Sequence, residues 1–172
     1  MCIRDRLEKA EEIRKNYAQY LDTEDQNLLI STGARASCYI AFEQGAYKTV
    51  LAKVQEINVR DKPNHLIDRY IFYIKANFEL GETHLILEKD EAFSNYLKDN
   101  YDRHQLGLDY KNSYQNFFDL TVMIINAKHE RFTKEFLLEK LDSFKGLVAD
   151  SKWLRRKIEL LPKKSPQTTP KN

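Results

Sequence analysis

Two stretches of this chain repeat one pattern, FEQGAY at residues 42–47 and FELGET at residues 78–83, and they start 36 residues apart. In each stretch a Phe-Glu pair precedes a glycine, Gly45 or Gly81, and an apolar stretch of helical period lies on either side. Glycine just past the last apolar turn is a common stop signal of a helix. The alternation of helix and glycine therefore predicts a series of antiparallel helix hairpins.

Apolar residues at steps of three and four predict helices along nearly the whole chain. The expected ranges are 24–44, 47–57, 64–80, 85–98, 110–125, 133–147 and 151–161, after an apolar stripe formed by Leu7, Ala10, Ile13, Tyr17 and Leu21. Pro63 suits the first turn of a helix, and residues 99–107 are the longest stretch without a pattern, so we expect a loop there. Sustained alternation of period two is absent, so strands are not expected. The prediction is an all-α fold of about seven or eight helices.

Composition agrees with an elongated helical protein. The chain has 172 residues, of which 42% are apolar and 31% charged, and it contains only five Gly and four Pro. A chain of this length suits one domain with a real core. No apolar run approaches the roughly 20 residues that a membrane-spanning helix needs, and no signal peptide is visible.

A single hairpin of this size buries too little apolar area to be stable alone, so such hairpins stack on one another. A period near 34 residues is typical of tetratricopeptide repeats. Residues 23–99 resemble two degenerate units of that family: the family's Gly-x-Tyr turn matches Gly45-Ala46-Tyr47, whereas the second unit has Gly81 with Thr83 in place of the tyrosine. The resemblance implies an α-solenoid of stacked antiparallel hairpins in a right-handed superhelix.

The chain also departs from the family pattern. Cys38 and Ile74 stand where the first helix of a unit usually has a small residue, and Val50 and Ile86 where the second helix has one. Over residues 23–161 the chain resembles a group of bacterial repeat proteins of unassigned role, through KANFELGETHLILEKDEAFSNYLKD, YKNSYQNFFDL and KWLRRKIELL in that order. That resemblance carries no catalytic motif, and it implies the C-terminal end of a longer protein.

The first six residues, MCIRDR, resemble a translated sequencing adapter, so we expect residues 1–6 to be an assembly artefact. The expected organisation is then a repeat domain over residues 7–161 and a disordered tail over residues 162–172, which holds three of the four prolines and no apolar anchor. We expect upstream repeats of the full-length protein to cover the stripe from Leu7 to Leu21. Without them, that face favours self-association.

The resemblance implies a groove lined by the first helix of each unit. The positions carried over are Arg35, Tyr39, Phe42 and Glu43, then Ile71, Lys75, Phe78 and Glu79. Such a mixture of aromatic and charged side chains is suited to an extended or helical peptide of a protein partner, with aromatic anchors supplying most of the energy. It lacks the Lys/Asn pattern that grips a C-terminal carboxylate. Packing within the fold is an equally weighted interpretation for Phe42 and Phe78, and plain solvent exposure is the favoured interpretation for Arg35 and Lys75.

The competing function is nucleic-acid binding by the basic C-terminal end. Residues 151–172 hold seven basic residues and one acidic residue, including Arg155, Arg156 and Lys157, and cations there could contact phosphates. The acid-rich remainder favours a solvated helix face instead, so nucleic acid is not the expected partner.

No pattern of catalytic or metal-binding residues is present. His84 and Glu88 share a helix face but amount to two ligands, and no phosphate loop, Gly-x-Ser-x-Gly or Cys-x-x-Cys occurs. Cys2 and Cys38 predict no disulfide, and Cys38 falls on an apolar face as a buried thiol. We therefore expect no enzyme activity, no cofactor and no metal, and a role in protein–protein interaction or scaffolding.

Overall fold

The computed structural model describes residues 23–57, 63–104, 107–127 and 132–162, together with the isolated positions 9 and 12. Helices are the only regular structure in these ranges, and none of these residues is in a strand. The expected all-α class is confirmed. The expectations for residues 1–6, for the apolar stripe Leu7–Leu21 and for the tail after Pro162 fall outside the described residues.

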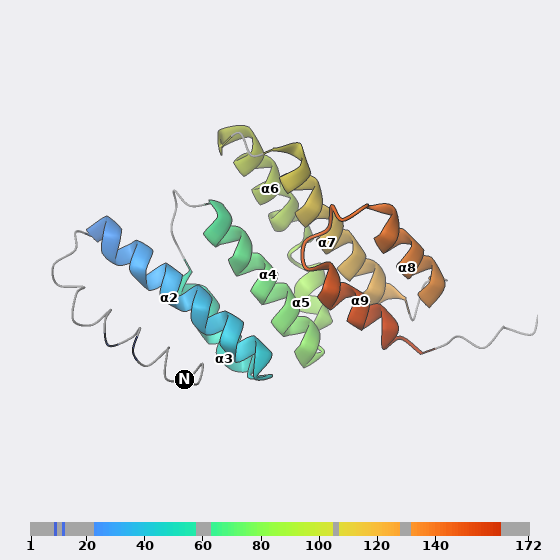
Figure 1. Cartoon of the computed structure of the whole chain (residues 1–172), viewed down its shortest axis with the longest axis horizontal. Helices are drawn as coiled ribbons and strands as arrows, with labels where there is room; N and C mark the ends of the chain where they lie inside the picture. Colours follow the sequence, from blue (N-terminus) through green and yellow to red (C-terminus); the bar gives the residue numbers. More distant parts are fainter. Residues whose placement is uncertain are drawn as a thin grey trace, which may run out of the picture. The chain divides into compact units, whose positions relative to one another are not determined.

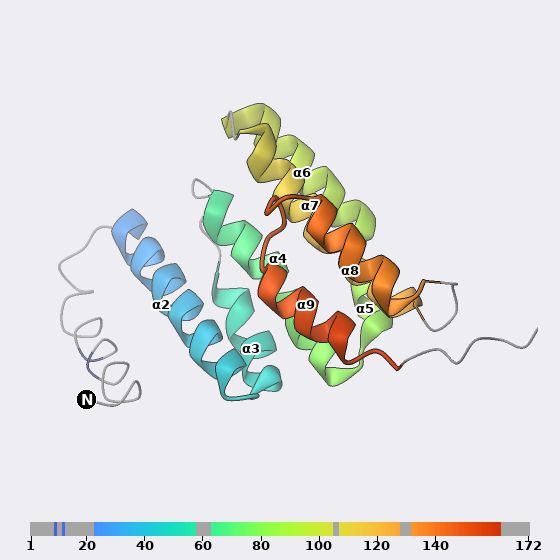
Figure 2. The ribbon, with the colours of Figure 1, turned by 45° about the vertical axis from the view of Figure 1, so that its right-hand side comes forward.

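The chain divides into two compact units, Met1–Ile86 and Leu87–Asn172. The expected repeat domain over residues 7–161 covers parts of both. In the first unit, α2 (Thr23–Glu43) is followed by α3 (Tyr47–Lys53), which tightens into the 3-10 turn η2 (Val54–Glu56), and then by α4 (Pro63–Leu80) and α5 (Thr83–Leu87). Helices α2 and α4 lie side by side and run in the same direction, and α3 packs against both (Figures 1 and 2).

The two glycine turns have one common geometry. After α2, the N–H of Ala46 donates to the carbonyl of Ala41 (2.8 Å) and that of Gly45 to Phe42 (3.0 Å). After α4, Glu82 donates to Asn77 (2.9 Å) and Gly81 to Phe78 (3.1 Å). With Gly45 at φ +72° and Gly81 at φ +79°, each turn is a Schellman motif, in which the left-handed residue lets two trailing N–H groups cap the last carbonyls. The repeated Phe-Glu-x-Gly pattern is therefore a repeated helix stop.

The core of the first unit lies between α2, α3 and α4. Fully buried side chains come from each helix and from the end of the 3-10 turn: Cys38, Val50, Val54, Ile57 and Ile74. On α2 the buried positions Ala34, Cys38, Ala41 and Phe42 recur at steps of three and four, which is the stripe that one buried helix face requires.

The second unit contains α6 (Asp90–His104), α7 (Leu108–Asn126), α8 (Lys134–Ser143) and α9 (Ser151–Glu159). Helix α7 contacts the other three, which explains the wide apolar arc of its sequence. Phe118 of α7 packs against Phe93 of α6 (ring centroids 5.2 Å apart), and Phe117 packs against Trp153 of α9 (5.8 Å). Two hydrogen bonds fasten the α8–α9 loop to α7: Ala149 N–H to Ser113 O and Asn116 Nδ2 to Leu147 O.

Two predicted boundaries were wrong. The loop expected at residues 99–107 is mostly helix, because α6 continues to His104. No glycine or proline occurs between Gly81 and Gly107, so nothing in the backbone stops the helix where the apolar period fades. The single helix expected over residues 85–98 is instead interrupted, since α5 ends at Leu87 and α6 begins at Asp90.

Candidate functional site

Arg35 on α2 forms an ion pair with Asp68 on α4. The Arg35 Nε atom donates to Asp68 Oδ2 at 2.6 Å, and Arg35 Nη2 lies against the same oxygen. The two side chains are half-buried, with 27% and 16% of their surface exposed. The plain solvent exposure favoured for Arg35 is therefore wrong: this side chain joins α2 to α4.

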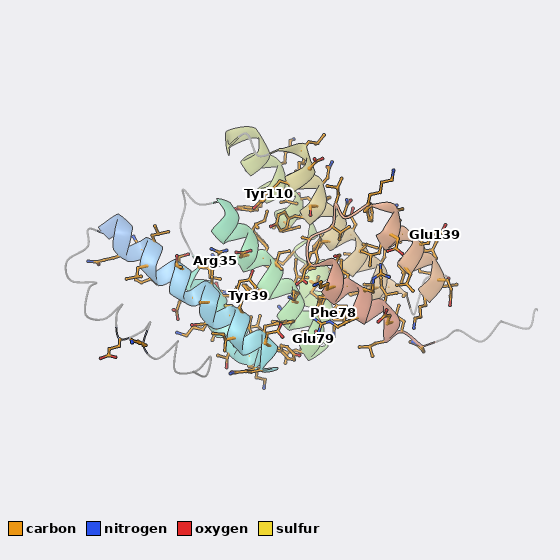
Figure 3. All side chains as sticks on the ribbon, viewed as in Figure 1. Arg35, Tyr39, Phe78, Glu79, Tyr110 and Glu139 are labelled. Atoms are coloured by element: carbon orange, nitrogen blue, oxygen red, sulfur yellow. The ribbon has the colours of Figure 1, made fainter. Side chains whose placement is uncertain are left out.

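Tyr39 lies one turn further along α2 and is the most exposed aromatic side chain of this face, at 53%. Its ring meets the buried ring of Phe72 on α4 edge to face, with centroids 4.7 Å apart and planes at 83°. This is the favoured geometry of two aromatic quadrupoles. Figure 3 shows Arg35 and Tyr39 on the side of α2 that faces α4. Tyr39 thus presents an outward aromatic surface on a fixed support.

Phe42 and Lys75 are buried together. Phe42 is 8% exposed and Lys75 is 7% exposed, and the Lys75 ammonium lies 4.1 Å from the centre of the Phe42 ring. Tyr47 packs on the same ring with its centroid at 5.3 Å. A lysine this close to an aromatic face gains a cation–π attraction while its methylene stem packs on apolar surface. The exposure favoured for Lys75 is therefore wrong, and Phe42 is a packing residue.

The remaining candidates lie near the ends of the same two helices. Ile71 is buried, Phe78 and Glu79 are half-buried in the last turn of α4, and Glu43 is exposed in the last turn of α2. Figure 3 shows Phe78 and Glu79 close to this end of α4. The α2–α4 face, which we define by Arg35, Tyr39, Glu43, Asp68 and Glu79, therefore carries charges at both ends and a tyrosine between them.

Asp68 and Phe72 were missed in the sequence, although a signal existed. Shifting Thr32 and Ala36 of α2 by the 36-residue repeat leads to Asp68 and Phe72 of α4. Thr32 and Ala36 precede Arg35 and Tyr39, respectively, by three residues, so Asp68 and Phe72 occupy the corresponding places on α4. Only the distance between the helices shows that they contact Arg35 and Tyr39.

Cys38 confirms the expected buried thiol. It has no exposed surface, and its Sγ lies 3.8 Å from the carbonyl oxygen of Val50. Burial, with a smaller contribution from the Glu56 carboxylate, raises the pKa of the thiol from 9.0 to about 12, against the opposing effect of Lys53. The thiolate is the reactive form of cysteine, so this side chain acts as an apolar packing group near neutral pH.

The α8–α9 hairpin carries a half-open pocket of about 200 Å³, lined by Leu141, Asp142, Gly146, Val148, Ser151, Lys152 and Arg155. Arg155 pairs with Asp142 across this pocket. The neighbouring lysines also have partners: Lys157 Nζ lies 5.9 Å from the centre of the Trp153 ring, and Lys134 Nζ donates to the carbonyl of Glu159 at 2.7 Å. Two of the four basic residues of α9, Arg155 and Lys157, therefore have contacts within their own hairpin.

Two further kinds of site are absent among the described residues. No three His, Cys, Asp or Glu side chains among them form a group that could hold a metal ion, and the exposed His84 has its Nδ1 atom 3.7 Å from Glu82 Oε2. Within the same ranges, no helix is both long and apolar enough to cross a membrane.

Comparison with protein-family models, with curated proteins and with solved structures gives no match for this chain. The resemblance to tetratricopeptide repeats accordingly stays a prediction.

Proposed function

We propose that this chain is a protein–protein interaction module that binds a peptide segment of its partner on the α2–α4 face. The observation that carries the proposal is Tyr39, an aromatic side chain that is half exposed although it rests edge-on against the buried ring of Phe72. Tyrosine is enriched among the residues that dominate binding energy at interfaces. A ring already fixed on its support loses little rotamer entropy when a partner covers it.

The surroundings of Tyr39 support a preformed surface. The Arg35–Asp68 pair and the Lys75–Phe42 contact both join α2 to α4. Because these contacts hold the two helices in register, the face does not need to be assembled when the partner binds. Interfaces that bind without rearrangement avoid an ordering cost.

The repeat architecture belongs to the same proposal. We infer that α2–α3 and α4–α5 are two copies of one tetratricopeptide-like unit, within a right-handed solenoid of stacked antiparallel hairpins. The equal Schellman turns at Gly45 and Gly81 and the parallel course of α2 and α4 support the shared unit. In such arrays the first helices of successive units line a continuous binding surface. A crystal structure of the chain tests the handedness.

The test uses a photo-crosslinking amino acid placed in the full chain at position 39 and, as a control, at position 136. Phe136 on α8 is also an exposed aromatic, at 43%, but lies outside the face. We expect partner peptides to be crosslinked from position 39 in cell extract and identified by mass spectrometry. Binding of an identified, purified partner should then weaken at least tenfold in Tyr39→Ala and be unchanged in Phe136→Ala. Equal crosslinking from both positions contradicts the proposal.

Nucleic-acid binding through α9 is the alternative class, and the contacts of Arg155 and Lys157 within the hairpin lend it no support. Its test is a gel-shift titration at low salt with the triple variant Arg155→Gln, Arg156→Gln, Lys157→Gln. A shift that the triple variant abolishes would favour the alternative, because binding through phosphates depends on cations.

A further inference from the structure

The charged side chains of the α2–α4 face differ in whether another side chain already contacts them. Arg35 is committed to Asp68, and Lys75 is buried beneath Phe42. Glu43, by contrast, is exposed and forms no ion pair among the described residues. Between Gln26 and Phe42, α2 has no charged residue except Arg35. The partly exposed guanidinium of Arg35 is already held by Asp68, so the Glu43 carboxylate is the charge on α2 next to Tyr39 that is open to a ligand.

The helix ends add to this negative potential. Neither α2 nor α4 has a basic residue in its last turn, although the C-terminal end of a helix carries about half a negative charge. Glu43 and Glu79 stand at these two ends, as the glutamates of the repeated Phe-Glu-x-Gly pattern. Since α2 and α4 run in the same direction, the negative ends of both helices lie on the same side of the face.

Tyr39 and Glu43 are four residues apart on α2 and both are exposed. Residues at this spacing are neighbours on a helix surface, with Cβ atoms about 5–6 Å apart. Side chains of a helix usually lean toward its N-terminus, and this direction would bring the Glu43 carboxylate over the turn that carries Tyr39. An aromatic ring beside a carboxylate is a receptor for a planar cation, because guanidinium stacks on the ring and pairs with the carboxylate.

We propose that the peptide bound on this face is cationic, and that an arginine of the partner binds between the Tyr39 ring and the Glu43 carboxylate. The inference rests on the proposed peptide-binding function and states its specificity. Charge complementarity selects the occupant: an acidic peptide would face the Glu43 carboxylate and the C-terminal ends of two helices, while the cations Arg35 and Lys75 are already engaged.

The experiment begins with a library of random 12-residue peptides displayed on phage and selected on the full chain. We expect arginine and lysine to be enriched over aspartate and glutamate among the selected peptides. One selected peptide is then synthesised with a fluorescent label, both as selected and with its arginine replaced by glutamine or by glutamate. Binding is followed by anisotropy with the full chain and with Tyr39→Ala, Glu43→Lys and Phe136→Ala.

Replacing the arginine of the peptide by glutamine should weaken binding about tenfold, which is the scale of one cation–π contact together with one exposed ion pair. Glu43→Lys should weaken binding of the arginine peptide by a similar factor and should restore binding of the glutamate peptide. Phe136→Ala should leave both affinities unchanged. Rescue by the double charge reversal is the decisive result, because loss of folding cannot produce it.

The outcomes separate the two proposals. Selected peptides that lose affinity in Tyr39→Ala but show no preference for cations, or that ignore Glu43→Lys, overturn the arginine inference and leave the proposed function standing. Enrichment of acidic peptides overturns the inference in the same way. Selected peptides that are all insensitive to Tyr39→Ala overturn the proposed function itself.

Discussion

Two helix pairs of this protein, α2 with α4 and α8 with α9, are each joined by one arginine–aspartate ion pair, in very different surroundings. Arg35 and Asp68 retain 27% and 16% of their side-chain exposure, whereas Arg155 and Asp142 retain 44% and 62%. The first pair links α2 to α4, which are separated in the chain by α3, while the second links α8 to α9, which follow each other directly. The same chemistry therefore contributes to a preformed surface in one region and to a solvated edge in the other, since screening by water sets the strength of an ion pair.

Removing one buried aromatic ring should lower the free energy of unfolding by a similar amount in both regions. Trp153→Ala on α9 and Phe72→Ala on α4 each remove a fully buried aromatic ring, and each should lower the free energy of unfolding by about 3–5 kcal/mol. Urea unfolding followed by circular dichroism measures this loss. Leu160→Ala is the control, because a side chain that is 76% exposed should change stability by less than about 0.5 kcal/mol. A loss below about 1 kcal/mol for Phe72→Ala would mean that Tyr39 lacks a rigid support.

Alkaline pH should distinguish the two cores, because the α2 core contains an ionisable thiol and the buried α8–α9 side chains are apolar. The folded state holds the Cys38 pKa at about 12, against 9.0 when unfolded. The unfolded state therefore binds fewer protons between these values, and stability should fall with rising pH by up to about 1.4 kcal/mol per pH unit. Below pH 9 the contribution is constant.

The measurement compares unfolding of the wild type and of Cys38→Ala from pH 8 to pH 10.5. The wild type should lose stability relative to the variant only above pH 9. Parallel curves over the whole range would contradict the burial of the thiol. Alkylation by iodoacetamide gives a second reading, since Cys38 should stay unmodified in the folded chain at pH 8.

The repeated glycine turns offer a smaller effect, confined to the first unit. Gly45→Ala and Gly81→Ala force a side chain into the left-handed region, at φ +72° and +79°, and each should cost about 1–2 kcal/mol. Gly33→Ala is the matched control within α2. No described atom lies within 4 Å of the added Cβ, so the gain in helix propensity should stabilise by up to about 1 kcal/mol. Equal effects at all three sites would argue against the Schellman geometry.

The smallest expected effect concerns the ion pairs themselves. A double-mutant cycle with Arg35→Gln and Asp68→Asn should give a coupling energy of about 1 kcal/mol, because partial burial reduces screening. The same cycle with Arg155→Gln and Asp142→Asn should give less than about 0.5 kcal/mol, as is usual for exposed pairs. Equal coupling energies would remove the distinction between the two regions.

Local features of this fold were predictable from the sequence. Helix periodicity, the stops at Gly45 and Gly81 and the start at Pro63 follow from interactions within a few residues, and the apolar stripe of α2 marks Cys38 for burial; the structure has each of these features. The end of α6 was predicted too early, at residue 98 instead of His104, because the apolar pattern fades there. An apolar pattern that fades does not end a helix unless a glycine, proline or cap does so.

The chain by itself determined which residues share a helix face, and thereby placed Arg35, Tyr39 and Phe42 together on α2. Only the tertiary structure decided what those residues do. Asp68 pairs with Arg35 across 33 residues, and Lys75 is buried under Phe42 across a similar separation. The physical reason is that the exposure of a long charged side chain depends on the neighbouring helix that covers it, and no local pattern records that neighbour.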